Sequence, residues 1–277
     1  MKNLENIAFE IRKSIFKTVC LNRAGHLASS LSSVEILVGL YLGNILRYDA
    51  KRPNWEERDR FILSKGHAAL ALYYVLAKAG YYEQEKVNSF CMEGSIFGGL
   101  ATYGKIPGVE MTSGSLGHGL SFAAGIAMAA RIKKDSLYNV YVMLGDGELQ
   151  EGEIWEAALF ISHNRLTNLT IIIDNNGIQA TGFSRNIMDL GDLNEKWRSF
   201  GFHVIEVDGH NINQLIDSLQ ITVDKPKVII ANTVKGKGLS FAEDKGDWHY
   251  KMPSEEEIEA GLQELGMTRE DLAVNEK

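Results

Sequence analysis

The chain has 277 residues, of which 45% are hydrophobic and 23% charged, and its formal net charge is −7. These values are typical of an ordinary globular chain, and they argue against nucleic acid as a partner. Cys20 and Cys91 have no paired spacing, so neither a disulfide framework nor a zinc site is indicated. Both thiols are expected to be small buried side chains.

The first segment has helical periodicity. Leu4, Ile7, Ile11, Ile15 and Val19 recur every three or four residues among charged side chains, unlike the unbroken apolar core of a signal peptide. No apolar run reaches the ~18 residues of a membrane span. We therefore expect no membrane association, and the cytoplasm is the default location.

Further along, short apolar runs alternate with helical patterns, which predicts an α/β fold with an open, mostly parallel sheet and helices on both faces. Strands are expected at 60–63, 139–144, 169–173, 202–207 and 227–234. Helices are expected from about 68, at 117–131, 151–164 and 192–200. The tail from about 253 is expected to form one or two exposed acidic helices, with Ser254 to Glu257 as a capping-box-like start. The helix at 117–131 is rich in small residues and is expected to pack closely on a neighbour, at a subunit contact. We find no repeat or low-complexity linker, so residues 1–277 are expected to form a single domain.

Polar residues follow the second and third of these strands. Asp146 lies between two glycines after the strand at 139–144, and Asn176 and Ile178 follow the strand at 169–173. A right-handed βαβ crossover brings both strand ends to one edge of the sheet. Mg²⁺ takes oxygen ligands, and a carboxylate, an amide and the Ile178 carbonyl could supply three, leaving room for phosphate oxygens and water.

The two glycines beside Asp146 have an expected role in this site. Gly145 and Gly147 should let the backbone turn sharply and come close to a phosphate, and the helix that follows should offer free N–H groups to an anion. Each of the two loops, taken alone, is equally compatible with an ordinary surface turn.

Together, Gly145-Asp146-Gly147 and Asn176 match the thiamine diphosphate motif, and the chain resembles the N-terminal, diphosphate-binding half of transketolase. The other matching runs occur in the family's order: Gly25-His26 before Ser29, 63–67, 107–110, 112–117, 145–152 and 235–238. The resemblance implies the thiamine diphosphate-binding fold and two cofactors, thiamine diphosphate and Mg²⁺, with Ca²⁺ or Mn²⁺ as substitutes.

In that family, a glutamate on a second, pyrimidine-binding domain ionises the cofactor. This chain stops where that domain would begin, so the resemblance implies a partner chain, a C-terminal transketolase subunit, in an α₂β₂ assembly with a two-fold interface. It also implies transfer of a two-carbon ketol unit from a ketose donor to an aldose acceptor, with sugars or sugar phosphates as substrates.

The resemblance assigns roles to individual residues. The metal ligands are Asp146, Asn176 and Ile178. The cofactor contacts are Ser29, His67, Gly114, Ser115, Leu116, Gly145, Gly147, Glu148, Lys235 and His249. Within this set, His67 and Lys235 would face the diphosphate. His26 and His249 match histidines that surround the thiazolium and guide protons, and Glu151 and Glu156 match carboxylates that couple two active sites through the interface. As a general rule, a lone histidine is more often a surface or core residue, and helix glutamates usually face solvent.

One departure from the family concerns Leu100, which replaces a histidine that bonds the donor ketose near its C1 hydroxyl. A buried hydroxyl left unpaired costs on the order of 1–3 kcal/mol, which favours a donor fragment without that hydroxyl, such as an acetyl unit from pyruvate. Alternatively the lost hydrogen bond is supplied by Thr102, Tyr103 or His118.

Other functions are compatible with the same motifs. Within thiamine chemistry, the chain could serve a deoxyxylulose-phosphate-synthase-like or a 2-oxoacid decarboxylating enzyme, although the run from Glu148 to Gly152 and the two histidines favour transketolase. Outside enzymology, it could be a noncatalytic scaffold that binds Mg²⁺ and phosphate. A dinucleotide fold is disfavoured, because the glycines at 114, 117 and 119 have the wrong order.

Overall fold

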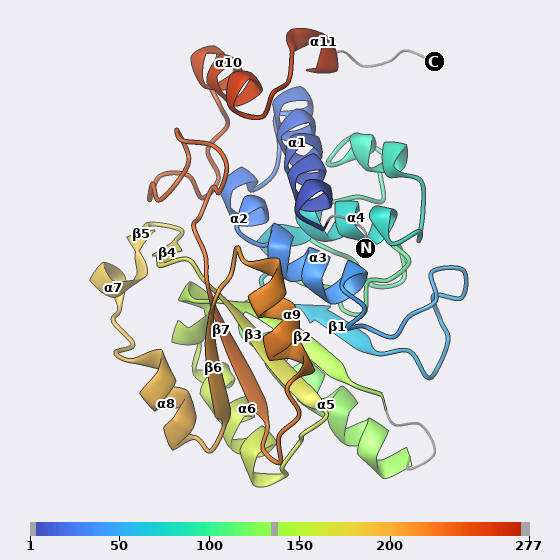
Figure 1. The fold of residues 1–277 in the computed structure, drawn as a ribbon, viewed down its shortest axis with the longest axis vertical. Helices are drawn as coiled ribbons and strands as arrows, with labels where there is room; N and C mark the ends of the chain where they lie inside the picture. The colour runs from blue at the N-terminus through green and yellow to red at the C-terminus, as the bar shows by residue number, and fades with distance from the viewer. Residues whose placement is uncertain (1–3, 134–137, 273–277) are drawn as a thin grey trace.

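A five-stranded parallel sheet forms the centre of the chain (Figure 1). The computed structural model describes residues 4–133 and 138–272. The strands run in the order β1-β2-β3-β7-β6, and all four pairings are parallel. Their bounds are β1 Arg60–Leu63, β2 Val140–Gly145, β3 Leu169–Asn175, β6 His203–Asp208 and β7 Lys227–Asn232.

Helices cover both faces of this sheet, as the sequence predicts (Figure 1). One face is covered by α1 Leu4–Asn22, α2 Leu27–Leu31, α3 Val34–Leu42, α4 Ala69–Lys78 and α9 Ile212–Gln220. The other is covered by α5 His118–Lys133, α6 Gly152–His163 and α8 Leu193–Ser199. The remaining elements are η1 Gly66–Ala68, η2 Gln84–Ser89, η3 Gly147–Gln150, β4 Ile178–Gln179, β5 Gly182–Phe183, α7 Ser184–Ile187, α10 Glu255–Glu264 and α11 Arg269–Leu272.

Strand β2 shows why two separate cores exist. Every residue of the strand is buried. Because successive side chains of a strand point to opposite faces, Val140 and Val142 join the core under α5 and α6, whereas Tyr141 and Met143 join the core under α1 to α4. This two-sided burial explains the nearly unbroken apolar run in the sequence.

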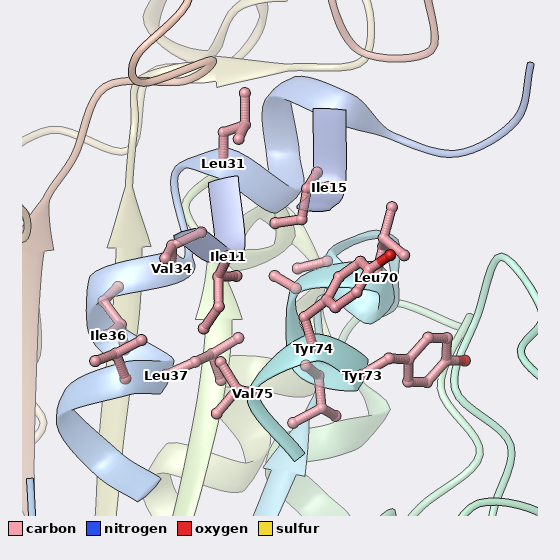
Figure 2. Packing of buried hydrophobic residues seen from close by; sticks show 14 of the residues in the cluster. Ile11, Ile15, Leu31, Val34, Ile36, Leu37, Leu70, Tyr73, Tyr74 and Val75 are labelled. Atoms are coloured by element: carbon pink, nitrogen blue, oxygen red, sulfur yellow. The ribbon is translucent and has the colours of Figure 1, made fainter. Parts of the chain in front are cut away.

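Figure 2 shows the core on the α1 side, where Ile11 and Ile15 of α1 meet Leu37 of α3 and Leu70 and Val75 of α4. All five side chains are at most 1% exposed. Burying such a side chain contributes about 1.5–3 kcal/mol relative to leaving it in water. These helices therefore form a stiff support for the loops at the sheet edge.

The C-terminal tail departs from its prediction in one respect. Ser254 and Glu257 form the predicted capping box at the start of α10. However, α10 is only partly exposed, because Ile258 and Leu262 are buried and a Cβ on Gly261 would lie 2.4 Å from the Phe16 ring. The tail is thus docked on α1. Within the part of the chain that the structure describes, no helix has the length and apolar character to cross a membrane.

Candidate functional site

Loops at the carboxyl edge of the sheet converge on one cavity of about 520 Å³. Lys65 follows β1, Asp146 follows β2, Asn176 follows β3 and Lys235 follows β7, and all four residues line this cavity. The four strands lie side by side, so their loops emerge together (Figure 1). Parallel sheets bind ligands outside the carboxyl ends of their strands, so this cavity is the first candidate for a functional site.

Asp146, Asn176 and Ile178 lie together in this cavity. Asp146 is 6% exposed, and its Oδ2 accepts a 2.6 Å hydrogen bond from Ser184 Oγ. Lys235 Nζ donates to the Ile178 carbonyl at 3.0 Å, and the Asn176 amide oxygen accepts from the Ile178 N–H at 3.2 Å. Burial, together with the charge of Asp174, raises the pKa of Asp146, and the hydrogen bond from Ser184 and the charges of Lys65 and Lys235 offset this only in part.

This oxygen set suits a hard divalent cation that keeps other ligands. Over residues 4–133 and 138–272, the structure has no cluster of three or more His, Cys, Asp or Glu that could hold a metal by itself. The trio contains one carboxylate, so a bound metal would need further oxygens from phosphate and water. The residues present therefore fit a metal that arrives with a phosphate ligand.

Basic side chains gather in the same cavity. The ring centroids of His26, His67 and His249 are 5.2 to 5.8 Å apart, and Lys235 Nζ lies 3.4 Å from His249 Nδ1. Burial and the charges of Lys235 and Lys65 lower the pKa of His26 to about 4. The pKa of His249 falls to about 4, that of Lys235 to about 8, and that of His67 well below its usual range, in each case chiefly by burial. An entering anion would stabilise these groups in their charged forms.

Two buried polar atoms in this cavity have no hydrogen-bond partner among the described residues. They are the hydroxyl of Ser29, a residue only 1% exposed, and Nδ1 of His26. Buried polar atoms are nearly always paired, so an unpaired atom in a cavity indicates a missing ligand or water. The unpaired atoms, the basic groups and the oxygen trio together fit a diphosphate with its metal.

Glu148 lines the cavity, but its carboxylate is already occupied. Oε1 accepts from the Gly117 N–H at 2.8 Å and from the Ser64 hydroxyl, and Oε2 accepts from the Gly145 N–H at 3.0 Å. Glu148 is 2% exposed. It therefore fastens three loops of the site to one another.

A buried ion pair lies beneath the basic groups. Lys65 and Asp174 side chains are both 0% exposed and form a salt bridge, and Asp174 also accepts a 2.7 Å hydrogen bond from Ser32 Oγ. Burial raises the pKa of Asp174, but Lys65 outweighs this and leaves it below its ordinary value. The pair joins the ends of β1 and β3 at the cavity wall.

The opening of the cavity has an apolar part, which includes Leu100, Leu116 and Cys91. The prediction that Cys91 is buried is wrong: it is exposed, whereas Cys20 is buried as predicted. Cys91 lies on an irregular loop with a φ of 57°, where no periodic pattern reveals burial. None of the alternative donors Thr102, Tyr103 and His118 lines the cavity, so the structure does not favour any of the three as a substitute for the histidine that the family resemblance implies at Leu100.

Gly145 and Gly147 lie where the chain turns from β2 into η3, and neither has a positive φ, so their backbone conformation does not by itself require glycine. Gly147 is needed instead for space, since a Cβ there would lie 2.7 Å from Gln179 Cβ. The element after Asp146 is the 3₁₀ helix η3, and α6 begins only at Gly152. By contrast, Gly114 with a φ of 145° does occupy a conformation that favours glycine.

Three predicted residues lie outside the cavity. Ser115, Glu151 and Glu156 are all exposed, and none of them lines it. For Ser115 this differs from the predicted cofactor contact. The two glutamates lie on the outer surface, and this exposed position is compatible with their expected role at an interface.

Some cavity residues have no predicted role. Lys65 comes just after a predicted strand and lies within the matching run 63–67. This position in the sequence could have predicted that Lys65 lines the cavity. Tyr250 lines the opening, with its ring centroid 4.8 Å from that of His26. Gln179 belongs to the small β4–β5 hairpin, which no alternating pattern in so short a segment reveals.

Comparisons with known proteins show which family this chain is similar to. Residues 5–277 match the family model described as the transketolase, thiamine diphosphate binding domain. The chain is 43% identical to an apulose-4-phosphate transketolase subunit of Actinobacillus succinogenes, covering 95% of each, and 39% identical to 6-deoxy-6-sulfo-D-fructose transketolase subunit SqwG of Clostridium sp. over 95% of this chain and 96% of that one. The solved structure of transketolase from Leishmania mexicana superimposes with a TM-score of 0.90 at 29% identity, covering 100% of this chain and 43% of that one.

Proposed function

The chain belongs to the transketolase family as its thiamine diphosphate-binding domain, and from this premise we propose that it works as the cofactor-binding subunit of a two-subunit transketolase. The observation that carries the proposal is the cavity at the sheet edge. There, depressed histidine and lysine pKa values and the unpaired Ser29 hydroxyl adjoin the oxygen trio of Asp146, Asn176 and Ile178.

In this proposal the residues of the cavity divide into two groups. Asp146, Asn176 and the Ile178 carbonyl hold Mg²⁺, with Ca²⁺ or Mn²⁺ as substitutes. The residues proposed to contact thiamine diphosphate are Ser29, His67, Gly114, Leu116, Gly145, Gly147, Lys235 and His249, all of which line the cavity. When bound, thiamine diphosphate supplies the carbanion chemistry of ketol transfer. His26 and His249 hold and move protons at the substrate, and as neutral rings they can accept one.

The length of the relatives supports a partner chain. Human transketolase is 35% identical over 96% of this chain, which spans only 42% of the human protein. The two relatives of matching length are named as transketolase subunits. We take the partner to be a C-terminal transketolase subunit with the pyrimidine-binding domain and its glutamate, in a cytoplasmic α₂β₂ assembly where residues 1–277 act as one domain.

The proposed reaction is transfer of a two-carbon ketol unit from a ketose to an aldose. Substrates are sugars or sugar phosphates. A second candidate is a transketolase-like enzyme with an altered donor, such as an acetyl unit from pyruvate, because Leu100 in the cavity would leave the C1 hydroxyl of a ketol unit without a partner. The names of the two relatives show that subunits of this kind act on different sugars, a phosphate ester in one case and a sulfonate in the other.

Reconstitution tests the proposal. The chain is mixed with a C-terminal transketolase subunit from the same source, and exchange of the cofactor's C2 proton is followed by NMR in deuterated buffer with Mg²⁺. We expect exchange and ketol transfer in the mixture and neither with one chain alone. If the mixture binds thiamine diphosphate without accelerating exchange, the chain is a scaffold and the enzymatic proposal is wrong.

A further inference from the structure

Lys235 is held in the cavity by a loop of unusual conformation. The residue is 1% exposed, and its side chain donates a hydrogen bond to the Ile178 carbonyl. The next residue, Gly236, has a φ of 82°, and a Cβ there would lie 2.5 Å from the Ala242 carbonyl oxygen. Such a loop can keep one conformation only if its backbone is fastened to the rest of the molecule.

Three polar side chains lie on the far side of this loop, of which Arg12 and Glu35 are buried and His210 is partly buried. Arg12 from α1 pairs with both carboxylate oxygens of Glu35 from α3, at 2.5 and 2.6 Å. His210, from the segment between β6 and α9, places Nδ1 2.9 Å from Glu35 Oε2. Burial raises the pKa of Glu35, but hydrogen bonds from His210 and Arg12 outweigh this and keep its carboxylate charged.

This cluster contacts the loop on both sides of Lys235. The backbone N–H of Val234 donates to His210 Nε2 at 2.8 Å, and Arg12 Nε donates to the Lys237 carbonyl at 3.1 Å. Since Nε2 accepts a hydrogen bond, it carries no proton, and the ring proton must sit on Nδ1, facing Glu35. The two contacts use different atoms and neither involves the Lys235 side chain.

We propose that Arg12, Glu35 and His210 form a positioning triad, which holds the backbone at Val234 and Lys237 so that Lys235 faces the bound diphosphate. This inference rests on the proposed function, in which Lys235 contacts the diphosphate. The triad touches neither cofactor nor substrate. It sets diphosphate affinity through Lys235, which distinguishes it from an ion pair that only joins α1 to α3.

A double-mutant cycle on the full chain tests the triad, with magnesium pyrophosphate as the probe and calorimetry as the readout. Lys235→Met should weaken binding on the order of 30-fold, the size of one charge-assisted hydrogen bond. His210→Leu and Glu35→Gln should each weaken it about tenfold by letting the loop move. In the Lys235→Met background, the same two changes should have almost no further effect.

Two further variants separate positioning from stability. His210→Gln offers an acceptor for Val234 and a donor for Glu35, so it should restore most of the affinity lost in His210→Leu. Thr18 lies on α1, the same helix as Arg12, but away from the loop. Thr18→Val removes the buried contact of its hydroxyl with Tyr74. It should lower the melting temperature and leave pyrophosphate affinity unchanged.

Each adverse outcome identifies a different error. The positioning role alone would be overturned if the affinity losses of His210→Leu and Glu35→Gln added to that of Lys235→Met. It would also be overturned if Thr18→Val weakened pyrophosphate binding as much as these two changes, because the triad would then act through general stability. Unchanged affinity in both His210→Leu and Glu35→Gln would overturn it as well. If Lys235→Met itself binds pyrophosphate normally, the assignment of Lys235 in the proposed function is wrong, and the triad falls with it.

Discussion

Asp146 and His26 line the same cavity but differ in chemistry, and this difference predicts different losses. Asp146→Ala removes the one carboxylate of the oxygen trio, so Mg²⁺-dependent retention of thiamine diphosphate should fall by about 100-fold or more. His26→Ala should leave retention largely intact and slow turnover of the reconstituted enzyme. Equilibrium dialysis with and without Mg²⁺ measures the first effect, and Asp217→Ala, exposed on α9, is the control. Equal cofactor loss in both variants would contradict this division of roles.

The lowered pKa of His26 predicts a pH dependence of stability. Its folded value is about 4 and its ordinary value is 6.5, because burial and then Lys235 and Lys65 disfavour the charged ring. Between these values the unfolded chain binds a proton that the folded chain does not, so stability should fall as pH falls from about 6.5 towards 4. Melting curves of the cofactor-free chain should show a shallower decline for His26→Asn. The surface variant His163→Asn is the control.

Leu100 carries the prediction on donor choice. It lines the cavity, and it packs against glycines, since a Cβ on Gly66 or Gly114 would meet its methyl groups at 3.1 or 3.0 Å. Leu100→His should raise kcat/KM for a hydroxylated ketose, relative to its 1-deoxy analogue, by about tenfold, as one hydroxyl gains a partner. Met92→His, exposed outside the cavity, should not. Equal rates of the unmodified complex with both donors would remove the idea.

At the scale of elements, two glycines of α5 predict opposite effects of the same substitution. A Cβ on Gly119 would lie 2.8 Å from the Ser64 backbone, whereas a Cβ on Gly125 would meet nothing within 4 Å. Gly119→Ala should cost about 1–3 kcal/mol of unfolding free energy by overpacking. It should also weaken pyrophosphate binding, because Ser64 supports Glu148. Gly125→Ala should stabilise the chain by about 0.5–1 kcal/mol. Urea denaturation measures the change in unfolding free energy for each variant. Changes of the same sign in the two variants would contradict this packing.

The sequence predicted the buried strands and missed what depends on tertiary partners. The strand expected at 60–63 matches β1, and apolar runs revealed β2 and the start of β3. However, β3 continues to Asn175, because Asp174 is neutralised by Lys65 from a different strand end. Hydrophobic patterning cannot detect such a pair. Helix α9 is absent from the predicted elements, although Asn211 caps it and its apolar residues recur at helical spacing.

The site was predictable to the extent that its residues occur in short motifs after strands. Asp146 and Asn176 directly follow β2 and β3, and His67 lies in η1, shortly after β1, so the parallel sheet brings the three segments together. The contacts of Glu148 and the cluster around His210 join segments far apart in the sequence, and they depend on how the helices pack on the sheet. Position in a motif therefore predicts which residues meet, whereas packing decides which of them face the ligand.

At the scale of the whole molecule, α6 has an exposed face that predicts how two copies meet. Glu156, Leu159 and Phe160 are spaced at i, i+3 and i+4, so they share one side of the helix. Leu159 is 61% exposed and Phe160 45%, although both are large and apolar. Because exposed apolar side chains often mark an interaction surface, we predict that a second protomer covers this face in the proposed two-fold assembly.

Leu159→Glu tests this face in the reconstituted complex. A charge there should leave the chain folded, within about 0.5 kcal/mol, because the side chain is at the surface. Light scattering during gel filtration should show the mass falling from two copies of each subunit to one, since two like charges would be buried together across a two-fold axis. Ile221→Glu, on a side chain 43% exposed just after α9 on the other face of the sheet, is the matched control and should not change the mass. An unchanged mass with Leu159→Glu would show that the two-fold interface lies elsewhere, and that Glu156 faces solvent as helix glutamates usually do.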